Sequence, residues 1–152
     1  MKKPTIRKVK PKDIDSVTRL IHNISDRDYN NSKKELWNIF RKSSYRIYRF
    51  VDSYVVELDK KIIGYGGIWS AKYDPKRFSM LDWFVVDKHH REIGIGHQLM
   101  KFLFERAVKR KIRYIYMLRL GLKTRRLSGF IRIWASSRFA KYQTIMTTTQ
   151  IL

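Results

Sequence analysis

The sequence predicts a mixed α+β fold, in which one sheet carries helices on both faces. Runs rich in β-branched and aromatic residues, which favour strands, alternate along the chain with segments whose apolar residues recur every three or four positions, which favour amphipathic helices. With 152 residues, 43% of them hydrophobic, the chain has the size of one domain and enough apolar surface for a core. We therefore expect a single domain over residues 1–152.

The N-terminal elements are expected to be a strand, a turn and two helices. Residues 5–10 alternate apolar and charged side chains, which predicts a short edge strand. Pro11 interrupts that strand, and Asp13 is placed to cap the helix that follows. The apolar face of this helix is formed by Ile14, Val17, Leu20, Ile21 and Ile24. A second helix is expected around residues 36–40, where apolar residues again share one face.

The middle of the chain predicts a β-hairpin. Two strand-like runs, residues 54–58 and 62–69, flank a charged turn. Residues 43–53 alternate aromatic residues with arginines, and this pattern fits either a helix end or an additional strand. A bulge or a close backbone approach is indicated in the second run by its glycines, Gly64, Gly66 and Gly67.

The chain is organised around residues 81–110. Residues 81–86, apolar except for Asp82, predict a strand, and residues 99–108 have the apolar spacing of a helix. The glycine-bearing turn 91–96 joins them and opens the helix. Unpaired N–H groups and the helix dipole attract anions, and glycine lets a phosphate approach the backbone. A phosphate or pyrophosphate site is predicted here, the alternative being a tight turn whose glycines only supply positive φ.

The C-terminal part is expected to contain a strand, a helix and a further strand. Residues 112–120 are apolar except for two arginines and predict a strand. Residues 122–134 combine basic and apolar positions in a pattern typical of an amphipathic helix. Residues 138–152 are apolar or threonine-rich and have strand character.

The sequence VDKHHREIGIG, residues 86–96, resembles the acetyl-coenzyme A signature of the GNAT superfamily of N-acetyltransferases, an Arg/Gln-x-x-Gly-x-Gly/Ala loop between the fourth strand and the third helix. The resemblance implies a central, twisted, mixed but mostly antiparallel sheet of about six to seven strands. It implies acetyl-coenzyme A as the cofactor and direct transfer of the acetyl group to an amine. The acceptor would be a small molecule, a peptide or protein, or an aminoacyl group on RNA.

The resemblance also implies a cofactor site at the strand–loop–helix junction. Backbone N–H groups of residues 93–97 would hold the pyrophosphate, and strand backbone at residues 84–86 would pair with the pantetheine arm. The implied cofactor-binding residues are Phe84, Val85, Val86, Arg91, Glu92, Ile93, Gly94, Ile95, Gly96 and His97. Glu92 departs from the family pattern, because it stands where glycine is usual and brings a carboxylate near the phosphates.

Amine acetylation requires a group that takes a proton, because an alkyl amine is mostly protonated at neutral pH. Asp82 is the candidate base, as the one carboxylate in an apolar strand; the alternative is a solvated residue or an ion pair. Family members often protonate the departing thiolate with a tyrosine on a late helix, but Trp134 stands at that position. The nearby hydroxyl groups belong to Ser136, Ser137 and Tyr142, and none of them matches the motif.

The charge balance leaves a second function open. Lys and Arg number 34 against 13 Asp and Glu, which gives a formal net charge of +21. Such a surface attracts polyanions, so the alternative is a basic binding module for nucleic acid or a protein partner, with reduced or lost catalysis. We expect a monomer or a homodimer.

Several features point to a cytoplasmic protein without a metal site. The chain has no cysteine and no apolar run long enough to cross a membrane, so we expect a cytoplasmic protein with no membrane contact. The histidines His89, His90 and His97 have no neighbouring carboxylate or thiolate cluster, and we expect no metal site.

Overall fold

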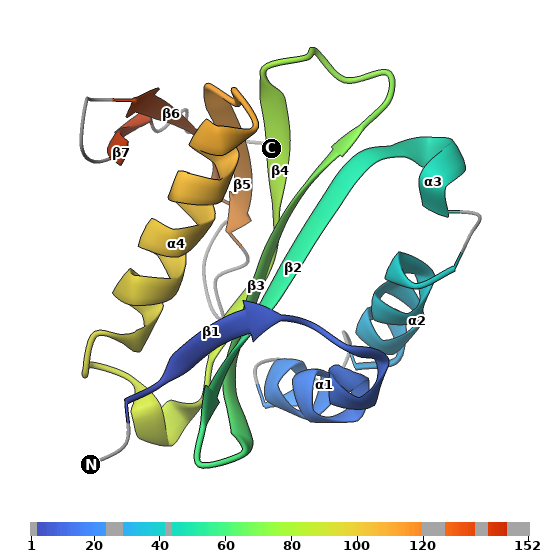
Figure 1. Ribbon diagram of the computed structural model, residues 1–152, viewed down its shortest axis with the longest axis vertical. Coiled ribbons are helices and arrows are strands. Elements are labelled where there is room, and N and C mark those ends of the chain that lie inside the picture. The colour runs from blue at the N-terminus through green and yellow to red at the C-terminus, as the bar shows by residue number, and fades with distance from the viewer. Residues whose placement is uncertain (1–2, 24–28, 42–43, 120–126, 136–139, 146–152) are drawn as a thin grey trace.

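The computed structural model describes residues 3–23, 29–41, 44–119, 127–135 and 140–145, and it describes side chains over residues 3–23, 32–41 and 46–116. The strands form one sheet in chain order: β1 (Thr5–Lys8), β2 (Tyr48–Leu58), β3 (Lys61–Ala71), β4 (Phe78–Val86), β5 (Tyr114–Arg119), β6 (Leu127–Ala135) and β7 (Ala140–Ile145). The helices are α1 (Ile14–His22), α2 (Tyr29–Ile39), α3 (Ser44–Ile47) and α4 (Ile95–Lys109), with short 3₁₀ turns η1 (Pro11–Asp13) and η3 (Lys88–His90). Helices α1 and α2 lie on one side of the sheet and α4 on the other (Figure 1), which confirms the predicted fold class.

The sheet is antiparallel at every pairing except that of β4 with β5, which is parallel. This parallel pairing covers only Phe78, Ser79 and Met80 of β4. Beyond Met80, the paired residues of β4 have partners on β3 alone within the described chain. The edge of β4 from residue 81 to residue 86 therefore presents backbone N–H and C=O groups that no strand of the described residues uses.

A β-bulge interrupts the same stretch of β4. Gly66 pairs with Phe84 and Ile68 pairs with Leu81, so that two residues, Asp82 and Trp83, lie opposite Gly67. A Cβ atom at Gly67 would come within 3.0 Å of the Ser53 hydroxyl oxygen and 3.1 Å of the Asp52 carbonyl oxygen. The bulge or close approach that the glycines predict is confirmed, and it re-aims the side chains of Asp82 and Trp83.

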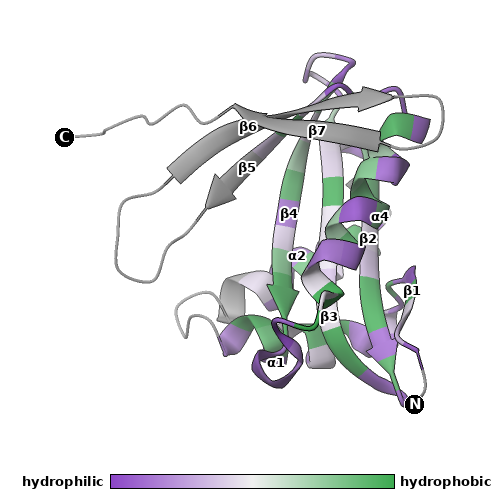
Figure 2. Cartoon of the chain, turned by 90° about the vertical axis from the view of Figure 1, so that its left-hand side faces the viewer, coloured by the Kyte–Doolittle hydropathy of each residue, from purple (hydrophilic) through white to green (hydrophobic). Residues whose placement is uncertain are grey.

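Two apolar clusters hold the helices against the sheet. Between α4 and the sheet, the buried residues include Leu99, Leu103, Phe104, Val56 and Ile68. On the opposite face, α1 and α2 pack on β2, β3 and β4 through Ile14, Val17, Ile21, Leu36, Val55, Tyr65 and Val85. The outer face of α4 is largely hydrophilic (Figure 2), as expected for an amphipathic helix on a sheet. No helix of the described chain is long and apolar enough to cross a membrane.

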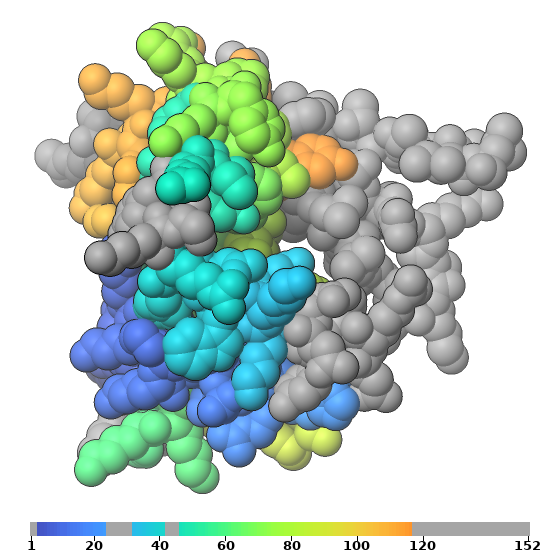
Figure 3. Space-filling model, turned by 90° about the vertical axis from the view of Figure 1, so that its right-hand side faces the viewer, coloured from blue at the N-terminus to red at the C-terminus, as the bar shows by residue number. Residues whose placement is uncertain are grey.

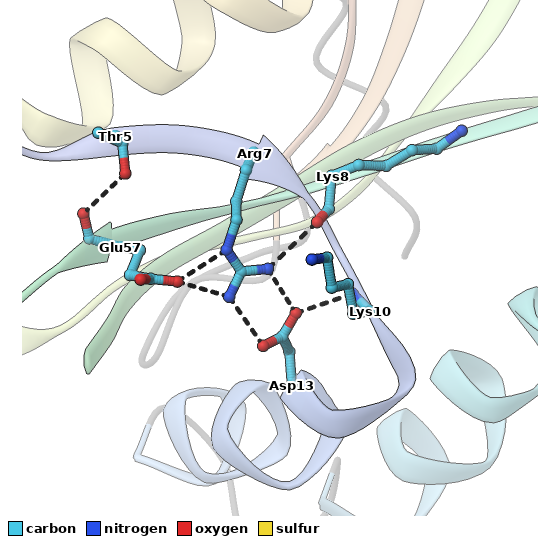
Figure 4. Close-up of polar contacts among 6 residues, drawn as sticks. All are labelled: Thr5, Arg7, Lys8, Lys10, Asp13 and Glu57. Atoms are coloured by element: carbon cyan, nitrogen blue, oxygen red, sulfur yellow. Dashed lines mark hydrogen bonds and ion pairs between the residues drawn. The ribbon is translucent and has the colours of Figure 1, made fainter. Parts of the chain in front are cut away.

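A charged cluster fixes β1 to β2 and to the start of α1 (Figure 4). The guanidinium group of Arg7 donates to both Asp13 oxygens, at 2.7 and 2.9 Å, and its Nε donates to Glu57 Oε2 at 2.7 Å. Asp13 also accepts a hydrogen bond from the Lys10 backbone N–H at 2.8 Å. The sequence predicts that Asp13 caps α1, but its side chain makes no capping hydrogen bond to that helix. Arg7 above all holds the pKa of Asp13 below its ordinary value.

Replacing Arg7 by methionine is expected to destabilise the protein by about 1–3 kcal/mol at neutral pH, because the Asp13 carboxylate, 5% exposed, loses its main partner. Arg7 stabilises the fold only at pH values where Asp13 is ionised. The difference in unfolding free energy between the wild type and Arg7→Met should therefore shrink as the pH falls through the lowered pKa of Asp13. Urea unfolding at several pH values measures this difference. Arg19→Met, on the exposed face of α1, is the matched control, and equal losses for the two variants would contradict the role of Arg7.

The C-terminal segment differs from the prediction. The helix predicted over residues 122–134 is wrong: β6 spans residues 127–135 and pairs with β5 on one side and β7 on the other. Nearly every position from Phe130 to Trp134 is apolar, so the sequence fits an amphipathic helix and a strand equally well. Pairing with β5 and β7 makes this segment a strand. Residues 120–126 and 146–152 lie outside the described residues. The ambiguous segment 43–53 contains both a helical turn, α3, and the start of β2.

Candidate active site

Three features of the candidate site meet around β4. The unpaired edge of residues 81–86, the bulge at Asp82 and Trp83, and the turn into α4 follow one another along the chain. Phe84 and Val86 face α4, while Val85 is 3% exposed and packs on the opposite face with α1. The three predicted strand residues are therefore fixed by packing, and their backbone forms part of the open edge.

The first turn of α4 is open to an anion. Gly94 is the N-cap residue with φ +86°, a left-handed conformation that favours glycine, and as a glycine it has no side chain with which to cap the helix. The first helical bond is made by the Gln98 N–H, which donates to the Gly94 oxygen at 3.0 Å. The four preceding N–H groups, residues 94–97, have no intrahelical acceptor. Ile95 is buried and anchors the turn, whereas Ile93 and His97 are exposed.

The loop before α4 is held to the end of β4. The Asp87 carboxylate accepts from the His89 backbone N–H at 2.9 Å, and its Oδ1 lies 3.0 Å from His90 Nδ1, which chiefly lowers the pKa of Asp87. Arg91 Nε donates to the Val86 carbonyl at 3.0 Å, so this arginine ties the loop to the strand. In the part of the chain that the structure describes, no three or more His, Asp or Glu residues gather into a metal site.

Glu92 adopts the left-handed conformation, with φ +65°. This strains an L side chain and explains physically why glycine suits the position. Its carboxylate is exposed in the loop immediately before Gly94. Glu92 therefore lowers stability through backbone strain in the loop and opposes anion binding through its charge.

Glu92→Gly is expected to raise stability by about 1 kcal/mol, since relief of the strain outweighs the extra chain entropy of glycine. It should also tighten binding of a phosphorylated ligand several-fold. Glu92→Gln separates the two effects, because it removes the charge and keeps the strain. Thermal unfolding and calorimetric titration measure them, and a glycine variant less stable than the wild type would contradict this account.

Asp82 lies on the α1–α2 side of the sheet, with its side chain partly exposed. Tyr65, fully buried in β3, donates its hydroxyl proton to Asp82 Oδ2 at 2.9 Å. Burial raises the pKa of Asp82 above its ordinary value, against the lowering effect of hydrogen bonds from the Trp83 backbone and the Tyr65 hydroxyl, and Glu35 adds a smaller increase by charge repulsion. Asp82 thus meets the requirement for a general base better than an ordinary exposed aspartate does.

A cavity of about 220 Å³ opens beside Asp82. Its carboxylates are Glu35 and Asp82, its aromatic walls are Tyr48, Trp69 and Trp83, and its aliphatic lining is Leu36, Ile39 and Val51. Trp83 Nε1 donates to Glu35 Oε2 at 3.1 Å, which joins the bulge of β4 to α2. Figure 3 shows this face of the molecule, where the surface is hollowed between α2 and the segment that carries α3.

Sequence reasoning found Asp82 but missed the rest of this cavity. Glu35 could have been noticed because it adjoins Leu36 on the inner face of α2, and Trp83 because it follows Asp82 opposite a glycine-rich strand. Tyr65 carries no such signal, since its contact with Asp82 depends on the strand register. The predicted thiolate-protonating position, Trp134, lies on strand β6 rather than on a helix, and its side chain lies outside the described residues, as do Ser136 and Ser137.

A model of the acetyltransferase (GNAT) family matches residues 18–128 of the 152-residue chain. The chain belongs to this family. The resemblance to the GNAT superfamily is thereby confirmed. The protein is therefore a GNAT-family acetyltransferase. Family membership leaves the acceptor open.

Solved GNAT structures share the fold of this chain. A protein from Desulfovibrio desulfuricans assigned to the family superposes with a TM-score of 0.68 at 14% identity, covering 80% of this chain and 76% of its own. A GNAT acetyltransferase from Staphylococcus aureus Mu50 gives 0.61 at 16% identity, with 78% and 75% covered. An aminoglycoside 6'-N-acetyltransferase in complex with coenzyme A gives 0.61 at 17% identity, with 75% and 61% covered. No curated protein sequence matches the chain.

Proposed function

We propose that this GNAT protein transfers an acetyl group directly from acetyl-coenzyme A to an amine, with Asp82 as the base that takes the amine proton. The observation that carries the proposal is the bulge in β4, which turns Asp82 into a cavity beside the open strand edge. A donor on that edge and an acceptor in that cavity would meet at the same point of the sheet. The arrangement thus supports direct transfer between two bound substrates.

The described residues fit the donor. Residues 84–86 offer backbone hydrogen-bonding groups to the amide groups of a pantetheine arm. The N–H groups of residues 94–97 and the dipole of α4 suit a pyrophosphate, and the exposed Arg91 of the preceding loop adds a positive charge. When bound, the donor supplies the acetyl group as a reactive thioester.

The acceptor must lose a proton before its nitrogen can attack. Asp82 takes that proton, and the hydrogen bond from Tyr65 keeps the carboxylate oriented. The raised pKa of Asp82 makes the carboxylate a stronger proton acceptor than an ordinary aspartate.

Calorimetric titration with acetyl-coenzyme A at moderate salt tests the donor half of the proposal. ATP and tripolyphosphate are the controls for generic anion capture, which a net charge of +21 makes essential. Selective binding of acetyl-coenzyme A is expected. Binding no tighter than that of the controls, and lost steeply as salt rises, would favour the alternative of a basic module for nucleic acid or another polyanion.

The rise of kcat/KM on the acid side of its pH profile (the acid limb) should follow the ionisation of Asp82, because only the ionised carboxylate accepts a proton. Glu35→Gln removes a charge that raises the pKa of Asp82, so the limb of kcat/KM should move to lower pH. Tyr65→Phe removes a hydrogen bond that lowers this pKa, so the limb should move to higher pH. Glu105→Gln, on α4 across the sheet, should leave the limb in place. Shifts of the same sign in the first two variants would contradict the assignment.

A further inference from the structure

We propose that the acceptor is a compact alkylammonium compound that carries no anionic group next to its reacting nitrogen. This inference rests on the proposed function, because it assigns the chemistry of the cavity beside Asp82. It names a substrate class that neither the fold nor the family determines.

The charge of the cavity is opposite to that of the protein. The chain has 34 basic and 13 acidic residues, yet the ionisable carboxyl groups of Glu35 and Asp82 line the cavity and no described lysine or arginine does. Tyr48 lines the same cavity as both carboxylates, and burial, followed by the charges of Asp82 and Glu35, raises the pKa of its hydroxyl. A cation that enters the cavity is therefore attracted by these carboxylates, whereas an anion is repelled by them.

The walls also suit a cation. Trp69 and Tyr48 meet edge to face, with ring centroids 5.3 Å apart and planes at 77°. Trp83 forms a further aromatic wall, and the hydrogen bond to Glu35 fixes its indole ring. Aromatic faces attract an ammonium group, most strongly where water is excluded. Rings and carboxylates together favour a protonated amine as the species that first binds.

The size of the cavity limits the group that enters. Its volume of about 220 Å³ lies below the range of about 300–1,000 Å³ that is typical of pockets for drug-sized ligands. The aliphatic side chains of Leu36, Ile39 and Val51 contact the alkyl part of such a ligand. A short alkyl chain with a terminal ammonium group fits this lining. An α-amino acid would bring its carboxylate within two bonds of the nitrogen and so into the field of both acidic side chains.

Pentylamine and norleucine test the inference, because norleucine is pentylamine with one carboxylate added beside the nitrogen. Norleucinamide, in which that carboxylate becomes a neutral amide, is the third probe. Calorimetric titration of each compound into the full protein at neutral pH measures binding without dependence on catalysis. Pentylamine should bind roughly tenfold or more tightly than norleucine, with norleucinamide between them.

Glu35→Gln keeps an oxygen that can accept from Trp83 and removes the charge, so it should weaken pentylamine binding and narrow the preference over norleucine to a few-fold. Glu105→Gln is the matched control and should preserve the preference. Equal binding of pentylamine and norleucine by the wild type, or a preference unchanged in Glu35→Gln, would overturn the inference.

The donor titration separates this inference from the proposed function. Failure of the amine preference with selective acetyl-coenzyme A binding intact would refute only the acceptor class. Failure of selective donor binding would refute the proposed function, while the amine titration would still decide what the cavity prefers.

Discussion

Replacing Asp82 by asparagine is expected to lower kcat by about 10²–10⁴-fold, the range over which a positioned base contributes. Asparagine keeps the size of the side chain and an oxygen that accepts from Tyr65, so the fold and the cavity should persist. The KM for acetyl-coenzyme A should change little, because Asp82 lies on the acceptor side of the strand edge. Steady-state rates of thiol release at several pH values measure the effect.

The defect of Asp82→Asn should shrink as pH rises. At high pH a growing fraction of the amine is already neutral, so the reaction needs the base less. Asp15→Asn, an exposed acidic position on α1, is the control and should keep the wild-type rate. A rate in Asp82→Asn within a few-fold of the wild type at neutral pH would show that the amine loses its proton to another group or directly to water.

Gly94→Glu is expected to weaken acetyl-coenzyme A binding roughly hundredfold, because losing two charge-assisted hydrogen bonds of about 1.5–3 kcal/mol each reaches at least that factor. The substitution forces an L side chain into φ +86° and places a carboxylate at the open turn of α4. Calorimetric titration with acetyl-coenzyme A measures the loss, and thermal unfolding verifies that the variant is folded.

Two further variants separate the causes of this loss. Gly94→Ala carries the backbone strain without the charge, and should give a smaller loss of affinity. Lys109→Gln lowers the net charge by the same single unit at the exposed opposite end of α4, and should bind like the wild type. If Lys109→Gln weakened binding as much as Gly94→Glu, the affinity would come from the overall basic charge and not from the turn.

Local patterns predict the elements near the site because those elements depend on neighbours in sequence. The hairpin of β2 and β3 follows from two β-rich runs and a charged turn, and α4 follows from its apolar spacing. The conformation of residues 127–135 cannot be predicted from a local pattern, because their apolar positions fit both a helical and a strand period. Their strand conformation depends on pairing with β5 and β7, which no local window contains.

The candidate site likewise has one part that the local sequence predicts and one part that it does not. The turn at residues 91–96 is visible in the sequence because glycines at a strand–helix junction have a local physical purpose. The cavity is not visible, because Glu35 lies 48 residues before its partner Trp83, and Tyr65 lies 17 residues before Asp82. The bulge opposite Gly67 creates this cavity, since it turns Asp82 and Trp83 toward α2. Register and bulge geometry arise only when the sheet is assembled.

The most direct test of amine acetylation is the stoichiometry of one reaction. The protein is incubated with acetyl-coenzyme A and pentylamine, and mass spectrometry quantifies free coenzyme A and N-acetylpentylamine. Equal amounts of the two products, formed by the wild type and strongly reduced in Asp82→Asn, are the predicted result. Release of coenzyme A without the N-acetyl product, or equal product in both proteins, would contradict direct transfer to an amine assisted by Asp82.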